Sequence, residues 1–356
     1  MKLMFIGYLH GYGGAEKMII YLANAMKKKG HEVIFIALSE NKSSYPLLSE
    51  IKYIFIEDRG ENKVIILWNR YKNLRKEILK VNPELIVNFW FQSVYLCCLM
   101  GNKIYRKVIY SERGDPSDRE YQGILKVIRM ICFKLIKGFV FQSNAAKRYF
   151  NRKIQEKAVV ISNPVFIDKN KIINITSDHH KIITVGRLHN QKNQKLLIEA
   201  LKEILPKYKN LILEIYGEGE LKEELNYIIN KYNLGNHIFL KGTTTEIYQK
   251  IKEASIFVLT SNYEGIPNVL LEAMALGVPC ISTDCKPGGV REIIKNMENG
   301  IIIPCNDVEA LKESIIFLLE NRNIANILGK NAEKIIELHS PKRIYQKWEK
   351  FFKSLI

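Results

Sequence analysis

Short apolar runs alternate along the chain with segments whose apolar residues recur every three or four positions. The short runs are typical of β-strands, and the longer spacing is typical of amphipathic α-helices. In the first half we expect strands at residues 3–7, 32–37, 53–56, 85–89, 107–110, 138–141 and 159–161. In the second half we expect them at residues 181–185, 211–216, 238–240, 256–259 and 279–282, with a short extended segment at 300–303. Strands that alternate with helices predict α/β domains with doubly wound parallel sheets.

The length of 356 residues suggests two domains, since a typical domain has roughly 150 residues. Residues 168–180, which follow Ser162-Asn163-Pro164, are polar and lack strong periodicity, so we expect the boundary there. We assign residues 1–166 to an N-terminal Rossmann-like domain and residues 167–340 to a C-terminal one. Residues 341–356 form a C-terminal helix that is expected to return to the first domain. A cleft between the two domains is the expected place for chemistry.

The composition is that of a globular protein, with 47% hydrophobic and 26% charged residues. The most apolar stretch, residues 85–101, contains Asn88 and Gln92 and is too short for a membrane span, which needs roughly 18 apolar residues. We expect a buried strand and a buried helix there. The N-terminus predicts a first strand and no signal peptide, because its apolar run is short. Six cysteines form no CxxC pair and have no flanking His at zinc-ligand spacing, which indicates a reducing compartment and no metal site.

The chain is basic, with 54 Lys and Arg against 37 Asp and Glu and a net charge of +17. Residues 1–166 hold 28 basic and 14 acidic residues, whereas residues 167–356 hold 26 and 23. This asymmetry indicates a nucleic acid or an anionic membrane as partner of the first domain. Residues 70–80 and 121–137 predict amphipathic helices with cations beside an apolar face. In the second helix the apolar face consists of Ile124, Val127, Ile128, Ile131 and Leu135, and the flanking cations are Lys126, Arg129, Lys134 and Lys137. Such helices lie on anionic lipid or pack on the sheet with solvated lysines, and for either one alone we favour packing.

Two loops at the carboxyl ends of predicted strands could bind phosphate. The first contains Gly13 and Gly14 and precedes a helix expected at residues 15–29, so it is either a phosphate cradle or a tight βα connection. The second, Gly186 to Asn193, contains Arg187 and Lys192. These two cations could neutralise a diphosphate leaving group, or they could be ordinary solvated loop cations.

The most informative segment contains Glu264 and Glu272. Pro267 fits the first position of a helix, which puts Glu264 in the loop before it and Glu272 two turns inside it. The N–H groups of Asn268, Val269 and Leu270 would then point out of the helix start, where an anion is favoured. The alternative is a simple helix start with an acid near its cap.

Two more loops follow predicted strands. Lys286-Pro287-Gly288-Gly289 is a further glycine turn, and Ser111 to Pro116 is a candidate acceptor or sugar-contact loop.

Together these segments resemble the retaining nucleotide-sugar glycosyltransferases of family 4, which have the GT-B fold of two facing Rossmann-like domains. The motifs that carry the resemblance are the Gly13-Gly14 turn, Gly186-Arg187-Leu188 with Lys192, the Glu264 and Glu272 pair, and the Pro287-Gly288-Gly289 turn. Their order and spacing are specific, and the resemblance extends over nearly the whole chain.

The resemblance implies a role for each of these residues. Arg187 and Lys192 would bind the donor diphosphate, Glu264 would contact the transferred sugar, and Glu272 would hold the ribose. Contacts to the sugar and phosphates are further implied for the helix start at Asn268, Val269 and Leu270, and contacts to the diphosphate for Gly13 and Gly14. No metal or other cofactor is implied. The family is usually assigned front-face attack, in which the leaving phosphate helps to remove the acceptor's proton and no protein nucleophile is needed.

One position departs from the family. Many members have a histidine in the acceptor-side loop, where this chain has Arg113, so Arg113 and Asp115 are kept as acceptor-side candidates.

The resemblance implies transfer of a hexose or N-acetylhexosamine from a UDP-sugar to a polyprenyl-diphosphate-linked saccharide. The pathway would build a bacterial capsule, lipopolysaccharide or exopolysaccharide. The basic first domain would dock on the inner, cytoplasmic face of the cytoplasmic membrane, and no nucleic-acid partner is expected. The alternatives are another GT-B enzyme, such as a nucleotide-sugar epimerase or a sugar phosphorylase, or a basic nucleic-acid-binding protein. The sequence names neither the sugar nor the acceptor.

Overall fold

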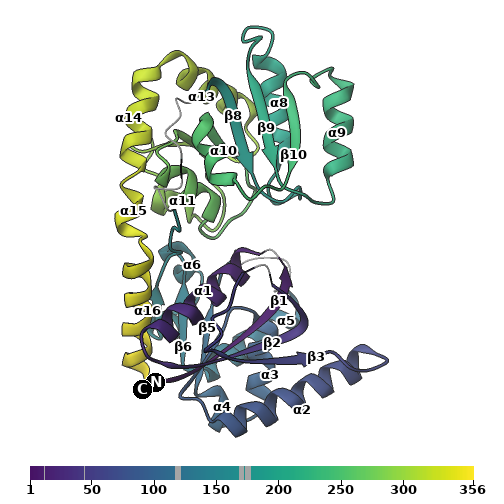
Figure 1. Cartoon of the computed structure of the whole chain (residues 1–356), viewed down its shortest axis with the longest axis vertical. Helices are drawn as coiled ribbons and strands as arrows, with labels where there is room; N and C mark the ends of the chain where they lie inside the picture. The colour runs from purple at the N-terminus through teal and green to yellow at the C-terminus, as the bar shows by residue number, and fades with distance from the viewer. Residues whose placement is uncertain (12, 44, 117–121, 168–171, 173–177) are drawn as a thin grey trace. The chain divides into compact units, whose positions relative to one another are not determined.

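The computed structural model describes residues 1–11, 13–43, 45–116, 122–167, 172 and 178–356. The chain folds into two compact units (Figure 1). Unit 1 comprises Met1–Asn163 and Lys342–Ile356, and unit 2 comprises Pro164–Pro341. The chain therefore passes between the units twice, after Asn163 and after Pro341. Most of the polar segment 168–180, where we expected the domain boundary, lies outside the described residues.

Unit 1 is built on a parallel sheet of seven strands in the order β3-β2-β1-β4-β5-β6-β7. The strands are β1 (Lys2–Gly11), β2 (Glu32–Ser43), β3 (Lys52–Glu57), β4 (Leu85–Asn88), β5 (Val108–Ser111), β6 (Gly138–Phe141) and β7 (Ala158–Val160). Every strand predicted for the first half is present, although β1 and β2 run several residues further than expected.

The helices of unit 1 lie between these strands along the chain, except the last, which follows unit 2. They are α1 (Gly14–Lys28), α2 (Lys63–Val81), α3 (Phe91–Leu99), α4 (Asn102–Tyr105), α5 (Ile124–Leu135), α6 (Asn144–Arg148), α7 (Arg152–Glu156) and α16 (Pro341–Leu355). The predicted strand and helix within residues 85–101 are thus confirmed as β4 and α3. Helices α2, α3 and α5 share one hydrophobic core with the sheet, to which they contribute Ile78, Val94 and Phe133, among others. The C-terminal α16 packs on the same unit, where Trp348 stacks on Phe89 with ring centroids 6.0 Å apart.

Helix α5 meets the sheet with a face different from the one we expected. Its buried residues are Arg129, Cys132 and Phe133. Arg129 donates to the Glu112 carboxylate over 2.5 Å and is almost fully buried, so the prediction that it is a solvated flank is wrong. The apolar residues that we expected to pack, including Ile124 and Val127, are instead 76% and 58% exposed.

Unit 2 is built on a parallel sheet of six strands in the order β10-β9-β8-β11-β12-β13. The strands are β8 (Asp178–Val185), β9 (Ile212–Tyr216), β10 (Ile238–Gly242), β11 (Ala254–Leu259), β12 (Cys280–Thr283) and β13 (Ile301–Ile303). The helices are α8 (Gln194–Ile204), α9 (Lys222–Lys231), α10 (Ile247–Glu253), α11 (Asn268–Ala275), α12 (Val290–Ile293), α13 (Val308–Glu320), α14 (Arg322–Ala332) and α15 (Ile335–Leu338). One core cluster joins the sheet to α8, α9, α13 and α14, and another joins it to α10, α11, α12 and α15. Helices therefore cover both faces, which confirms the doubly wound α/β prediction.

Each sheet has a point at which the strand order reverses. It lies between β1 and β4 in unit 1 and between β8 and β11 in unit 2. Open α/β sheets bind ligands in the crevice at the carboxyl ends of the strands on either side of such a point. The loops that follow these four strands are therefore the first places to look for a site.

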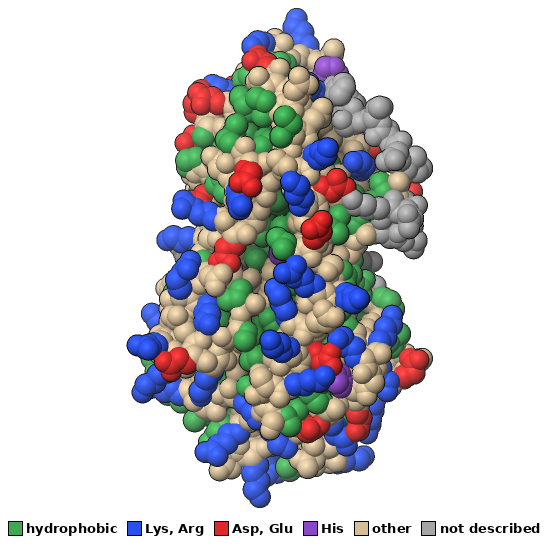
Figure 2. Space-filling model, turned by 90° about the vertical axis from the view of Figure 1, so that its left-hand side faces the viewer, with side chains coloured by type: hydrophobic (Ala, Val, Ile, Leu, Met, Phe, Trp, Pro, Cys, Tyr) green, Lys and Arg blue, Asp and Glu red, His purple; other side chains and the backbone are tan. Residues whose placement is uncertain are grey.

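The division into units sharpens the charge asymmetry of the sequence. Unit 1, with α16 included, carries 33 Lys and Arg against 15 Asp and Glu, whereas unit 2 carries 21 against 22. Figure 2 shows one face of the molecule, over which basic side chains are spread widely. Within the described part of the chain, no helix is both long and apolar enough to cross a membrane.

Candidate active site

Lys192 and Glu264 form an ion pair in unit 2. The Lys192 Nζ lies 2.5 Å from Glu264 Oε1, and both side chains are largely buried. Lys192 lies in the loop after β8 and Glu264 in the loop after β11, so the pair spans the switch point of the sheet. The structure thus brings together two residues that lie 72 positions apart in the sequence.

Two hydroxyl groups of the Glu264 loop, which runs from β11 to α11, hold this pair in place. The Ser261 hydroxyl donates to the same Glu264 oxygen over 3.0 Å. The Thr260 hydroxyl lies within hydrogen-bonding distance of the backbone carbonyl oxygens of Lys192 and Asn193, at 3.0 and 2.9 Å. Asn193 adopts a left-handed conformation with φ 47°, which ends the loop before α8. The Lys192 ammonium is therefore positioned before any ligand arrives.

Arg187 lies in the same loop and is exposed. Its Nη2 donates to Gln191 Oε1 over 3.2 Å, and Gln191 Nε2 donates to the carbonyl oxygen of Tyr263 over 3.0 Å. The guanidinium is thus connected to the loop of Glu264 and keeps an open side toward solvent.

The glycine turn after β12 supports the Glu264 loop. The Glu264 N–H donates to the Lys286 carbonyl oxygen over 2.8 Å. A Cβ at Gly289 would lie 1.7 Å from the carbonyl oxygen of Gly265, so a side chain cannot fit there. Packing between loops therefore explains Gly289 without a ligand.

Helix α11 begins at Asn268, one residue later than predicted. Pro267 is the residue before the helix, with φ −71° and ψ 117°, so its expected place as first helical residue is wrong. Its carbonyl oxygen accepts the N–H of Leu270 over 3.2 Å, and the Leu270 side chain is fully buried in the core. Of the three expected N–H donors, Asn268 and Val269 are the ones that are partly exposed.

Glu272 lies in the second turn of α11 and is 8% exposed. Its Oε1 accepts a hydrogen bond of 3.1 Å from the Tyr248 hydroxyl of α10. Sequence reasoning did not find Tyr248, because no motif marks a tyrosine on a neighbouring helix.

The remaining predicted residues belong to unit 1. Gly13 precedes α1 with φ −143°, a conformation open to any residue, and a Cβ there would meet only the Glu16 Cβ, at 3.8 Å. Gly14 is the first helical residue and is exposed. Neither conformation nor close packing within unit 1 thus requires glycine at position 13.

Arg113 is bound within unit 1. Its Nη1 donates to Asn163 Oδ1 over 2.7 Å, and its guanidinium lies 4.3 Å from the Phe89 ring centroid and 5.5 Å from that of Trp348. Burial lowers the pKa of Arg113 to about 9, although the nearby Glu112 acts in the opposite direction. At this pKa the guanidinium is charged at neutral pH. Asp115, in the same loop, is buried.

No group of three or more His, Cys, Asp or Glu side chains that could hold a metal ion occurs among the described residues.

Two Rossmann-like units with parallel sheets define the GT-B architecture of glycosyltransferases. The crystal structure of Anabaena HepE in complex with UDP has this fold, with a TM-score of 0.81 and 18% identity over 99% of this chain and 100% of that one. The chain belongs to the glycosyltransferases: residues 12–169 match the family described as Glycosyltransferase Family 4, and residues 166–335 match Glycosyl transferases group 1.

Two relatives agree with this assignment. An uncharacterised glycosyltransferase of Methanocaldococcus jannaschii is 31% identical over 271 residues, which are 68% of this chain and 66% of that protein. A Campylobacter jejuni enzyme is 24% identical over 358 residues, 98% of each chain. It is named GalNAc-α-(1→4)-GalNAc-α-(1→3)-diNAcBac-PP-undecaprenol α-1,4-N-acetyl-D-galactosaminyltransferase. The protein is thus a glycosyltransferase, which disfavours the epimerase, phosphorylase and nucleic-acid-binding alternatives.

Proposed function

We propose that this glycosyltransferase moves a hexose or N-acetylhexosamine from a UDP-sugar to a polyprenyl-diphosphate-linked saccharide during bacterial surface polysaccharide synthesis. The observation that carries the proposal is the buried Lys192–Glu264 pair at the switch point of unit 2. The UDP bound to Anabaena HepE supports the donor, and the undecaprenol-linked acceptor in the name of the Campylobacter relative supports the acceptor. The surface polysaccharide made in this way would be a capsule, a lipopolysaccharide or an exopolysaccharide.

In this proposal, Lys192 and Arg187 neutralise the departing diphosphate. Lys192 is already held by Glu264, so little reorganisation is needed as negative charge develops on the leaving group. The partly exposed start of α11 at Asn268 and Val269 adds N–H groups, which favour an anion. With these cations and N–H groups the transfer needs no metal.

Glu264 is assigned to the transferred sugar and Glu272 to the ribose hydroxyls, for which a carboxylate is a suitable acceptor. Tyr248 would orient the Glu272 carboxylate through its hydrogen bond. For Gly13 and Gly14 we keep the role of a diphosphate contact, because unit 1 itself does not require glycine at position 13.

The proposed reaction retains the configuration of the sugar. The acceptor oxygen attacks C1 from the side on which the diphosphate leaves, and the bond between C1 and the diphosphate oxygen breaks. The acceptor's proton passes to the departing phosphate. The protein contributes charge stabilisation and alignment of the two substrates.

We further propose that the enzyme docks on the inner face of the cytoplasmic membrane as a peripheral protein. Unit 1 carries the basic excess, and α5 exposes Ile124, Val127 and Ile131 beside the exposed Lys126 and Lys134. Apolar residues flanked by lysines are typical of helices that lie on anionic lipid.

The test is nucleotide release from a panel of UDP-, GDP- and ADP-sugars in EDTA, with and without a membrane-lipid extract as acceptor. We expect release from a UDP-sugar that depends on the extract, with the anomeric configuration retained in the product as read by NMR. Release that requires a divalent metal would refute the metal-independent mechanism, inversion would refute the front-face one, and a GDP- or ADP-sugar as donor would refute the UDP assignment.

A further inference from the structure

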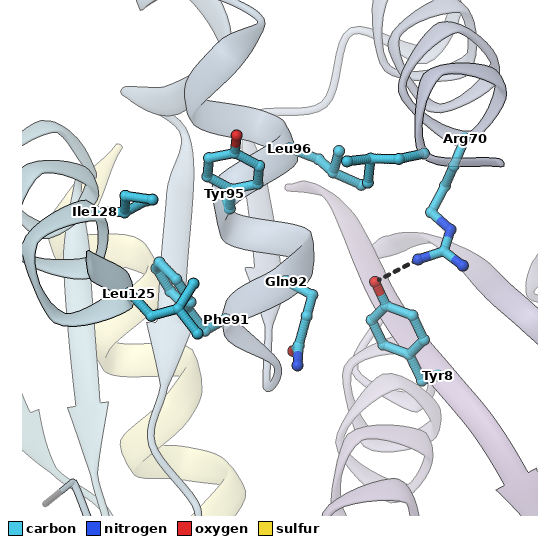
Figure 3. A pocket seen from close by; sticks show the side chains of 9 residues that line it. Tyr8, Arg70, Phe91, Gln92, Tyr95, Leu96, Leu125 and Ile128 are labelled. Carbon is cyan, nitrogen blue, oxygen red and sulfur yellow. Dashed lines mark hydrogen bonds between the residues drawn. The ribbon is translucent and has the colours of Figure 1, made fainter. Parts of the chain in front are cut away.

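An apolar pocket of about 560 Å³ lies between α2, α3 and α5 of unit 1 (Figure 3). Leu67 of α2, Tyr95 and Leu96 of α3, and Leu125 and Ile128 of α5 form its walls. A volume of this size is within the range of small-molecule sites. No residue that we expected in the donor site lines it, so it is a separate feature of the molecule.

The inner end of the pocket is polar and lies where the sheet of unit 1 is expected to bind ligands. Tyr8 of β1 lies two residues beyond Ile6, which pairs with the last residue of β4, Asn88. Tyr8 is therefore at the carboxyl edge, beside the switch point between β1 and β4. Figure 3 shows the Arg70 guanidinium beside the Tyr8 hydroxyl, to which Nη1 donates over 3.3 Å.

Arg70 is itself held by Asp58, to which Nη2 donates over 2.6 Å. Gln92 at the start of α3 also lines this end, directly after the loop that follows β4. The Arg70 guanidinium at the polar end is thus held in a fixed orientation by its hydrogen bonds.

The outer end of the pocket continues into an exposed apolar surface. Leu67 and Leu125 line the pocket and are also 42% and 48% exposed. Each has exposed apolar neighbours on its helix, which are Val64 and Trp68 on α2 and Ile124 and Val127 on α5. The pocket therefore joins the ligand edge of the sheet to the surface that we assign to the membrane.

Exposed lysines accompany this apolar surface. Lys63 and Lys72 lie on α2, and Lys126 and Lys134 lie on α5. The Lys72 ammonium lies 5.6 Å from the Trp68 ring centroid, so a cation and an exposed aromatic side chain occur together. This pattern complements a molecule with an apolar chain and an anionic group.

We propose that the pocket receives the isoprenoid chain of the lipid-linked acceptor next to its diphosphate. The inference rests on the proposed function, since it assigns a place to the lipid of that acceptor. A saccharide alone has no use for walls of leucine and isoleucine, because these side chains make no hydrogen bonds to its hydroxyls. A membrane acyl chain would have no reason to reach the ligand edge of the sheet. An acceptor must place its sugar at that edge while the far end of its lipid stays in the membrane, so the isoprene units next to the diphosphate have to cross the space between, which the pocket provides.

The experiment measures binding by titration calorimetry without membranes. The probes are geranylgeranyl diphosphate, with four isoprene units, and isopentenyl diphosphate, with one. We expect the four-unit probe to bind at least about tenfold more tightly, because buried apolar groups add affinity. Leu125→Trp should reduce that affinity about tenfold by filling the pocket, and it should leave the affinity for the one-unit probe unchanged.

The control is Leu99→Trp, at a residue of α3 that is 55% exposed and does not line the pocket. It should change neither affinity. Leu67→Trp, in the wall formed by α2, should have the same effect as Leu125→Trp. Because either variant fills the pocket, the test can still be made if one of them does not fold.

Equal affinities of the wild-type protein for the two probes would overturn the proposal, as would Leu99→Trp and Leu125→Trp having equal effects. Equally tight binding of monomeric dihexanoyl phosphatidylglycerol would assign the pocket to membrane lipid instead. Failure of the proposed function itself is seen separately, as absence of nucleotide release from every donor-sugar in the panel.

Discussion

The Lys192–Glu264 pair shows which residues of a site can be predicted from the sequence and which cannot. Both residues were predicted from a motif and its spacing. They come together in the structure because loops after neighbouring parallel strands meet at one edge of the sheet. Their supports, the Ser261 and Thr260 hydroxyls, were not predicted. A single serine or threonine in a loop has no spacing that distinguishes it, and its partner becomes visible only when the chain is folded.

Arg113 was predicted as an acceptor-side contact, and its surroundings in unit 1 suggest a positioning role. We expect Arg113→Gln to destabilise the protein by about 1–3 kcal/mol, because Asn163 loses a charge-assisted hydrogen bond and the Phe89 and Trp348 rings lose a cation. The check is chemical denaturation together with the KM for the acceptor. Arg152→Gln, at an exposed residue of α7, is the matched control and should have neither effect.

A large rise in the acceptor KM of Arg113→Gln with unchanged stability would instead support direct contact with the acceptor.

Helix α5 shows why the orientation of an element is harder to predict than its existence. Its apolar periodicity predicted a helix correctly, and by the usual rule the apolar face should pack on the sheet. The structure buries Arg129 instead, because Glu112 from the loop after β5 neutralises it inside unit 1. A buried ion pair of this kind depends on a partner 17 residues away, which periodicity alone does not reveal.

The docking of α16 is expected to depend on pH. Hydrogen bonds from Lys29 and Lys353 lower the pKa of Glu349 to about 2, and burial lowers the pKa of His31, which lies beside it. In both cases the unfolded chain takes up a proton at a higher pH than the folded one, so stability falls as the pH falls. The loss should begin below about pH 6.5 for His31 and should continue from pH 4.5 toward pH 2 for Glu349.

Thermal unfolding followed by circular dichroism between pH 7 and pH 3 tests this expectation. Glu349→Gln should lower the midpoint at pH 7 and weaken the dependence below pH 4.5, whereas Glu57→Gln, at an exposed carboxylate, should leave both unchanged. Identical pH profiles for Glu349→Gln and the wild-type protein would contradict the assignment.

The whole molecule was predictable at the level of fold class, although the order of the strands in each sheet was not predicted. The alternation of strands and helices predicted two doubly wound domains, and every predicted strand is present within a few residues of its expected limits. Parallel strands buried on both faces give strong apolar runs, which is why they were found. Pocket walls drawn from β1, α2, α3 and α5 could not be found in this way, because they depend on how helices pack over the sheet.

The excess positive charge of unit 1 leads to a prediction about membranes. Vesicles with anionic lipid should retain the protein better than neutral vesicles, and the difference should shrink as salt is raised, because exposed charges are screened over roughly 10 Å at 0.1 M salt. Changing Lys126 and Lys134 of α5 to Ala should weaken retention. The same change at Lys207 and Lys312, which lie in unit 2, should not.

Equal retention by neutral and anionic vesicles would contradict membrane docking through unit 1.

The most direct measurement is the turnover number for nucleotide release from the donor that the panel identifies, in EDTA. We expect Lys192→Ala and Glu264→Gln each to lower it by about 100- to 1000-fold, because both residues act on charge that develops during transfer. Lys207→Ala, at an exposed ion pair with Glu320, should keep wild-type turnover. Wild-type turnover in either Lys192→Ala or Glu264→Gln would show that the sugar is transferred somewhere other than at this pair.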